Sequence, residues 1–249
     1  HVFNFPPFQE TVKLESDLLF TRSIDPWWTA FRLKDVCLST GALNYLSLHS
    51  TVRKYRQLFD DNNLPDVYNG LMYFRFSQTA ADFFRAARIV FDNWDSISLL
   101  LKQVDQDPTT DVVYAIATLM NGEELVTMPS MDFIKFTHMK SAINNFPGEW
   151  LDAVLTEFDD AMIRINNLNQ YAPLHYQVKQ FATDELIEQY DMVKNYLLND
   201  SSLANAKKPI LWIHVENGIN AIYIADHGTL QGTASYFDFS GDGVSATVN

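Results

Sequence analysis

Two carboxylates separated by one residue follow a predicted strand near the start of the chain. Val12 and Leu14 alternate with polar residues, which is the pattern of a strand with one buried face. The strand ends at Glu15-Ser16-Asp17, where side chains at i and i+2 of an extended backbone project to the same side. Hard divalent cations prefer oxygen ligands and are often shared between carboxylates and substrate phosphates. Glu15 and Asp17 therefore predict a site for Mg²⁺ or Mn²⁺, with a solvated strand end as the alternative.

Two further groups of polar residues lie at the starts of predicted elements. Asp111 begins an apolar helix, where its carboxylate could position or deprotonate a hydroxyl group. Helix capping is the alternative, since Thr109 and Thr110 are capping residues as well. Asn69 and Gly70 precede an apolar strand, and glycine lets the backbone approach a ligand closely. A plain turn before the strand explains this pair equally simply.

The elements that must position these residues alternate along most of the chain. A strand at 71–76 is apolar on both faces, which predicts a central position in a sheet. Ser77 is expected to cap the most regular helix, which runs to about Trp94. The remaining patterns predict helices at 26–31, 50–63, from 95, at 110–120 and at 183–198, and strands at 35–39, 124–128, 132–137, 210–215, 221–225 and 234–239.

Strands that alternate with helices indicate an α/β main body. The last three strands are separated only by turns that contain glycine, which predicts a small antiparallel β element at the C-terminus. We therefore predict a main domain over 1–200 and a β-rich extension over 201–249.

Composition excludes several classes of protein. The chain has 249 residues, is 47% hydrophobic and carries a net charge of −13, which disfavours duplex DNA as a partner. Cys37 is the only cysteine, so the chain cannot form an internal disulfide. No apolar stretch approaches the roughly 18 residues of a membrane span.

The order of the motifs resembles nucleotide-sugar-dependent glycosyltransferases of the GT-A fold, especially glycogenin-like and phage or bacterial sugar transferases. The resemblance covers roughly residues 8–145. Four segments follow one another in the family's order: Glu15-Ser16-Asp17, 69–75, Thr110-Asp111 and 137–140. The usual metal motif of the family is Asp-x-Asp, so Glu15 departs from it at the first acid. The resemblance implies a GT-A-like mixed sheet flanked by helices.

In such enzymes a histidine late in the domain often completes the metal shell, and a lysine after it contacts phosphate. His138 and Lys140 match these residue types, at a tighter spacing than the glycogenin-like His-x-x-Gly-x-x-Lys. The resemblance also places Asn69 and Gly70 beside the sugar and acceptor. If the reaction inverts the configuration of the anomeric carbon, the resemblance makes Asp111 the catalytic base. If the reaction retains that configuration, as the glycogenin-like match implies, the resemblance makes Asp111 an orienting group.

The resulting expectation is a metal-dependent glycosyltransferase that uses a nucleotide sugar, in the first place a UDP-sugar. The acceptor is a glycan, a protein or a modified base. GT-A domains begin with a half that binds the nucleotide, so this resemblance implies a missing N-terminal half. We expect the protein in the cytoplasm of a bacterial or phage-infected cell.

Other functions stay open at this point. A haloacid-dehalogenase-like phosphatase requires a nucleophilic Asp where this chain has Glu15. A glycosidase requires two carboxylates on either side of a scissile bond, and residues at i and i+2 rarely face each other in that way. A non-catalytic interaction or structural module on a degenerate transferase scaffold is the main alternative.

Overall fold

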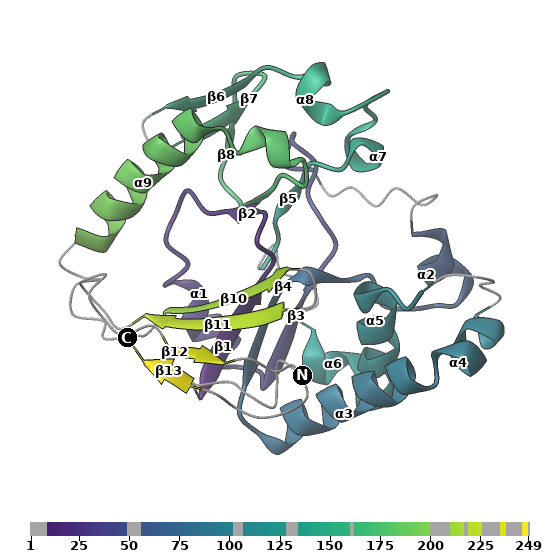
Figure 1. Ribbon diagram of the computed structural model, residues 1–249. Helices are drawn as coiled ribbons and strands as arrows, with labels where there is room; N and C mark the ends of the chain where they lie inside the picture. The colour runs from purple at the N-terminus through teal and green to yellow at the C-terminus, as the bar shows by residue number, and fades with distance from the viewer. Residues whose placement is uncertain are drawn as a thin grey trace. The chain divides into compact units, whose positions relative to one another are not determined.

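The computed structural model describes residues 9–48, 56–101, 107–127, 134–159 and 162–199, together with four short strands after residue 209. The chain divides into two compact units, His1–Gln189 and Tyr190–Asn249. The described residues of the first unit form helices and small open sheets (Figure 1), so the predicted α/β class is confirmed.

A three-stranded antiparallel sheet forms the centre of the first unit. Strand β4 (Val67–Arg75) pairs with β1 (Glu10–Leu14) on one side and with β3 (Val36–Thr40) on the other. Both faces of β4 are buried, as the unbroken apolar run of this segment predicts.

Two helices, α3 (Gln78–Asp92) and α5 (Thr110–Asn121), cover one face of this sheet. The hydroxyl of Ser77 accepts a hydrogen bond from the backbone N–H of Ala80 at 3.2 Å, which confirms the predicted helix cap. Alternate residues of the strands and the inner faces of both helices share this core: Val36, Leu38, Met72, Phe74, Phe83, Ala87, Val90, Val112 and Val113.

Aromatic side chains cover the opposite face of the sheet. Helix α1 (Trp27–Phe31) lays Phe31 flat against Tyr73 of β4, with ring centroids 4.8 Å apart. Trp27 and Trp28 both pack edge-on against Phe31. These tryptophans therefore anchor the short helix to the core.

A second, mixed sheet joins distant parts of the sequence. Strand β9 (Leu174–His175) lies between β2 (Leu18–Leu19), with which it is antiparallel, and β5 (Thr137–His138), with which it is parallel. Each strand has only two residues, but the sheet brings the ends of three loops together.

The third sheet is an antiparallel meander of β6 (Thr156–Asp159), β7 (Met162–Ile165) and β8 (Leu168–Gln170). Asn166 and Asn167 connect β7 to β8 with φ values of 49° and 64°. Asparagine tolerates the left-handed conformation that a two-residue hairpin turn requires.

Shorter elements complete the first unit, and α9 continues past its end. They are α2 (Gln57–Asp61), α4 (Trp94–Leu100), α6 (Glu123–Val126), α7 (Ser141–Asn144), α8 (Trp150–Ala153), the 3₁₀ turn Lys179–Phe181 and α9 (Asp184–Asn199). Helix α9 confirms the helix that the sequence predicts at 183–198.

The strand predicted at 124–128 is wrong, because this segment begins with helix α6. Gly122 has a φ of 96°, which turns the chain between α5 and α6. The backbone N–H and the hydroxyl of Thr127 both donate to the carbonyl of Glu123, at 3.0 and 2.7 Å, and close the helical turn. Two acidic residues in the first turn favour the helix as well.

Two other predicted elements lie only partly within the described residues. Of the strand predicted at 132–137, only Thr137 is in a strand among the described residues, and Ile134 has a φ of 59°, which is not an extended conformation. Of the helix predicted at 50–63, the described part forms α2, and the predicted cap at Ser50 lies outside the described residues.

The second unit contains two antiparallel pairs. Strand β10 (Ile210–Glu216) pairs with β11 (Ile219–Ala225), and β12 (Ser235–Phe237) pairs with β13 (Ala246–Val248). The antiparallel β element predicted at the C-terminus is therefore confirmed. Among the helices of the described residues, none has the length and apolarity needed to cross a bilayer.

Candidate metal centre

A tight turn at the end of β1 presents the two carboxylates. The N–H of Glu15 donates to the carbonyl of Gly70 at 2.9 Å, which is the last contact of β1 with β4. The N–H of Leu18 then donates to the carbonyl of Glu15 at 3.3 Å and closes the turn. Glu15 and Asp17 do lie on one side, as predicted, but the turn rather than an extended strand brings them together.

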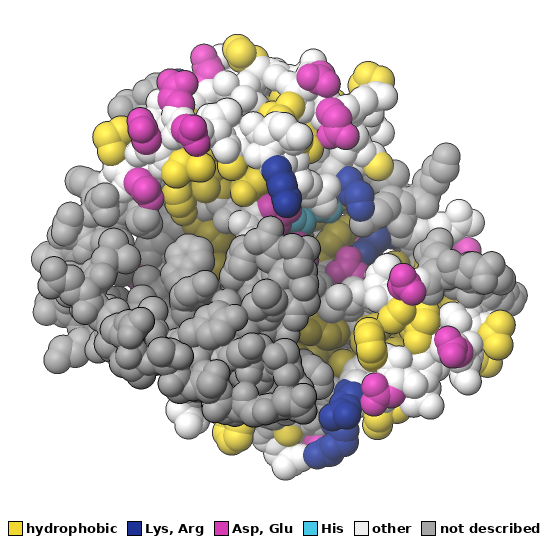
Figure 2. Space-filling view, viewed as in Figure 1, with side chains coloured by type: hydrophobic (Ala, Val, Ile, Leu, Met, Phe, Trp, Pro, Cys, Tyr) yellow, Lys and Arg dark blue, Asp and Glu magenta, His cyan; other side chains and the backbone are white. Residues whose placement is uncertain are grey.

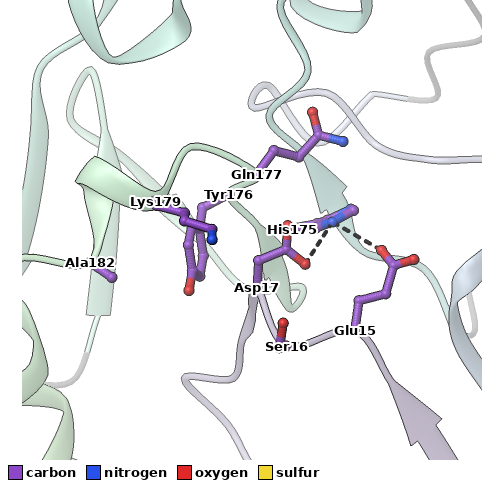
Figure 3. Close-up of a pocket in the computed structure, with 8 residues that line it drawn as sticks. All are labelled: Glu15, Ser16, Asp17, His175, Tyr176, Gln177, Lys179 and Ala182. Atoms are coloured by element: carbon purple, nitrogen blue, oxygen red, sulfur yellow. Dashed lines mark ion pairs between the residues drawn. The ribbon is translucent and has the colours of Figure 1, made fainter. Parts of the chain in front are cut away.

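The second sheet places His175 against both carboxylates. Leu18 of β2 pairs with His175 of β9, and the N–H of Tyr176 donates to the carbonyl of Asp17 at 3.1 Å. His175 Nε2 lies 3.1 Å from Glu15 Oε2 and 3.0 Å from Asp17 Oδ1. Figure 3 shows both carboxylates pointing at this one ring nitrogen.

The three groups are strongly coupled electrostatically. Burial lowers the pKa of His175, but hydrogen bonds to Asp17 and Glu15 and their negative charges outweigh burial and raise it to about 9. The hydrogen bond from His175 lowers the pKa of Glu15, against the effect of burial. Burial is the largest single influence on the pKa of Asp17 and raises it, but the hydrogen bond and the charge of His175, with smaller contributions, together lower that pKa. Without a metal ion, the histidine is therefore an imidazolium between two carboxylates.

His138, the predicted third ligand, lies behind His175 and not against the carboxylates. The two imidazole rings are stacked, with centroids 4.7 Å apart and an angle of 10° between the planes. Burial, together with the charge of His175, lowers the pKa of His138 to about 2, so its ring is neutral. His175 Nδ1 is buried and has no hydrogen-bond partner within the described residues. Stacking on His138 therefore fixes the orientation of the His175 ring.

Asn69 and Gly70 lie directly beside Glu15. The amide of Asn69 is 3.4 Å from Glu15 Oε1, at the long end of a hydrogen bond, and Lys13 Nζ donates to the Asn69 carbonyl at 2.8 Å. A Cβ atom at Gly70 would lie 3.3 Å from Glu15 Oε2 and 3.4 Å from the ring of Phe136. Glycine thus leaves the carboxylate room to lie against the backbone.

Asp111 is linked to the centre through Asn69. One carboxylate oxygen accepts the backbone N–H of Asn69 at 2.7 Å, and the other accepts Arg56 Nη1 at 3.0 Å. Burial raises the pKa of Asp111, although Arg56 and the Asn69 N–H oppose this effect. The side chain of Arg56 is only 2% exposed, and it also binds Asp66. Asp111 therefore ties helix α5 to β4 rather than capping its own helix.

The carboxylates and His175 line a pocket of about 800 Å³. Figure 2 shows histidine side chains in a hollow of this face, with acidic and basic side chains beside them. Tyr176, Gln177 and the exposed Lys179 line the same pocket. Lys140, the predicted phosphate contact, is half-buried before α7 and is not among the described residues that line the pocket.

The donor set fits a divalent cation. One ligand atom from each of Glu15, Asp17 and His175 can be chosen so that all three lie within 4.8 Å of one another. Two carboxylate oxygens and an imidazole nitrogen suit Mn²⁺, and the carboxylates suit Mg²⁺. A cation held there would take the place of the proton on His175 Nε2.

The sequence assigned no role to His175. It lies in a two-residue strand, which is too short to show periodicity, and its neighbours Leu174 and Tyr176 carry no metal-binding motif. The signal that identifies His175 is its pairing with Leu18, which is a long-range contact.

Comparisons of this chain with protein-family models, curated proteins and solved structures found no significant match.

Proposed function

We propose that this protein is a metal-dependent glycosyltransferase of GT-A type that transfers a sugar from a nucleotide diphosphate sugar to an acceptor hydroxyl. The observation that carries the proposal is the convergence of Glu15, Asp17 and His175 on one point at the wall of a pocket of about 800 Å³. A pocket of this volume suits a ligand of the size of a nucleotide sugar.

In this proposal Glu15, Asp17 and His175 hold Mn²⁺ or Mg²⁺. The cation would neutralise the charge that develops on the pyrophosphate leaving group. His175 must release its proton to bind the cation, so the affinity for the cation rises with pH up to the pKa of about 9. The exposed ammonium group of Lys179, in the lining of the same pocket, supplies a further positive charge for phosphate.

The same proposal revises three roles. The metal-binding histidine is now His175 instead of His138, and the phosphate-binding lysine is Lys179 instead of Lys140. His175 and Lys179 line the pocket together with the carboxylates. Asp111 becomes a positioning residue, since it contacts Asn69 and Arg56. Asn69 and Gly70 support Glu15 and lie next to the sugar site.

The geometry disfavours the hydrolytic alternative. A glycosidase needs its two carboxyl groups on either side of the scissile bond. Here both carboxylates hydrogen-bond to the same nitrogen of His175, at 3.1 and 3.0 Å, which leaves no room for a glycosidic bond between them.

The donor, the acceptor and the location belong to the same proposal. A UDP-sugar is the donor in the first place, and a glycan, a protein or a modified base is the acceptor, in the cytoplasm of a bacterial or phage-infected cell.

Thermal unfolding of the full chain tests the proposal. Mn²⁺ is added with UDP, GDP or their sugars, and release of free nucleotide is measured in parallel. Saturation at a hundredfold over the dissociation constant stabilises a protein by about 2.7 kcal/mol, which is a visible shift. The shift should require metal and nucleotide together, and nucleotide release should accompany it.

Asp17→Ala should abolish the shift, whereas the exposed Asp152→Ala is the matched control and should retain it. No shift with any nucleotide, in a protein that circular dichroism shows to be folded, would overturn the proposal. A metal-dependent shift without any nucleotide release would instead identify a non-catalytic binding module.

A further inference from the structure

A second, smaller pocket lies at the other end of the β2–β9 ladder. It has a volume of about 210 Å³, and its lining includes Arg22, Ser23, Trp27, Tyr171 and Pro173. Pockets for drug-sized ligands measure about 300–1,000 Å³, so this one suits a single ring. None of its lining residues belongs to the metal centre.

Aromatic surfaces form much of this pocket. Trp27 packs edge-on against Phe31 at 6.1 Å between centroids, is partly exposed, and lines the pocket. Tyr171 is 52% exposed, and the Arg22 guanidinium stacks over its ring at 4.2 Å. Stacking on tyrosine holds the long arginine side chain in place at the pocket.

The polar groups of the pocket are mainly hydrogen-bond donors. The Tyr171 hydroxyl accepts from the amide of Asn169 at 3.2 Å, so its own O–H can donate to a ligand. The Ser23 hydroxyl accepts the N–H of Asp25 at 3.1 Å and has the same free capacity. Arg22 adds several N–H donors, and none of the described residues that line the pocket carries a carboxylate.

We propose that this pocket binds one pyranose ring of a glycan. A pyranose offers an apolar C–H face to an aromatic ring and a rim of hydroxyl oxygens to donors, which is the combination that Trp27, Arg22 and Tyr171 present. A phosphate would need more positive charge than Arg22 alone. An apolar chain would leave the donors of Arg22 and Ser23 unpaired.

The location of the pocket suggests which glycan it binds, and this step rests on the proposed function. Asp17 and Phe20 border the two pockets and flank the two residues of β2, three positions apart in the sequence. At about 3.3 Å per extended residue, their separation is at most roughly 10 Å. The ring is therefore part of the acceptor, a short distance along the glycan from the hydroxyl that reacts.

Glycan binding to the full chain tests the inference. An array of mono- to hexasaccharides is screened first, and the best ligand is then titrated by tryptophan fluorescence. We expect binding that Arg22→Ala and Tyr171→Ala each weaken about tenfold or more. The fluorescence change should disappear in Trp27→Phe, which keeps a ring against Phe31.

The controls separate this inference from the proposed function. Arg88→Ala removes an exposed arginine from α3 and should not change the affinity, and Asp17→Ala should leave glycan binding intact. Absence of any bound glycan, or an affinity that Arg22→Ala and Tyr171→Ala do not reduce, would overturn the pyranose site even if metal and nucleotide bind. Competition of the glycan by uridine would overturn it too, since it would assign the pocket to a nucleobase.

Discussion

At the scale of single residues, the key feature of the centre is the imidazole of His175, which contacts the carboxylates of both Glu15 and Asp17. His175 Nε2 lies within 3.1 Å of both Glu15 and Asp17, and its other ring nitrogen is buried. Below its pKa such a group is protonated and forms an ion pair with its neighbours, and it must be neutral to bind a cation. A proton and a metal ion would therefore compete for the same position.

The first prediction concerns the stability of the metal-free protein as pH rises. The pKa of His175 is about 9 in the folded state and 6.5 for a histidine in water, so protonation favours the folded state. This contribution is complete below pH 6.5 and is lost as the pH rises through 9, with an upper limit of about 3 kcal/mol. Urea unfolding in EDTA between pH 6 and 10 measures it.

Two variants control that experiment. His175→Gln should remove the loss of stability above pH 6.5, because no group titrates at this position. His138→Phe should retain it, because the neutral ring of His138 acts only as a stacking surface. Equal stability of the wild-type protein at pH 6.5 and pH 9 would show that the ion pair does not stabilise the fold.

The second prediction concerns the residues behind Glu15. Asp111 accepts a hydrogen bond from the backbone N–H of Asn69, and the side-chain amide of Asn69 contacts Glu15. Substitution of Asp111 or Asn69 should therefore weaken metal binding without removing a metal ligand. We expect Asn69→Ala to lower the affinity for Mn²⁺ about 10- to 100-fold, as is usual when a partner of a ligand is lost. Calorimetric titration measures this change.

Asp66→Ala is the matched control for this network. It also removes a partner of Arg56, but among the described residues the Asp66 side chain hydrogen-bonds to neither Asn69 nor Glu15. Its affinity for Mn²⁺ should stay within about threefold of the wild-type value. If Asn69→Ala has the same affinity as the wild-type protein, the amide has no part in positioning Glu15.

The residues of the centre differ in how far the sequence could identify them. Glu15 and Asp17 are neighbours, so a local motif was enough to predict a shared site. Asn69 and Gly70 were predicted to lie beside the sugar and acceptor, and the structure places them at Glu15. His175 is 158 positions after Asp17 in the sequence, and only the β2–β9 pairing brings the two together.

At the scale of elements, length decided which predictions were correct. Helix α3 has 15 residues and strand β4 has 9, and both carry a clear apolar pattern. Helix α6 has only 4 residues, and its sequence suits a strand as well as a helical turn. The hydrogen bonds of Thr127 to Glu123 and the turn at Gly122 decide its conformation.

The third prediction concerns helix α3, which supports the central sheet. Ser77→Ala removes the hydroxyl that accepts the N–H of Ala80, and we expect a loss of about 1 kcal/mol in the free energy of unfolding. Ser98→Ala in helix α4, where the hydroxyl donates to the carbonyl of Asp95 at an exposed position, is the control, with an expected change within about 0.5 kcal/mol. Equal effects of the two substitutions would contradict a specific role for the cap.

At the scale of the whole molecule, the charge of the chain and the candidate site have distinct consequences. A net charge of −13 disfavours polyanions in general, whereas a cation bound between the two carboxylates would create a local site for phosphate. The α/β class and the C-terminal antiparallel element could be predicted from local patterns. The assembly of the centre from β1, β2 and β9 could not, because it depends on pairing across distant loops.

The most direct test of the metal centre is pulsed electron paramagnetic resonance of Mn²⁺ bound to the full chain in the presence of UDP. We predict one bound ion with a nitrogen coupling from a histidine and a phosphorus coupling from the nucleotide. The nitrogen coupling should be lost in His175→Gln and retained in His138→Phe. A nitrogen coupling that survives His175→Gln, or bound Mn²⁺ without any coupling to phosphorus, would contradict it.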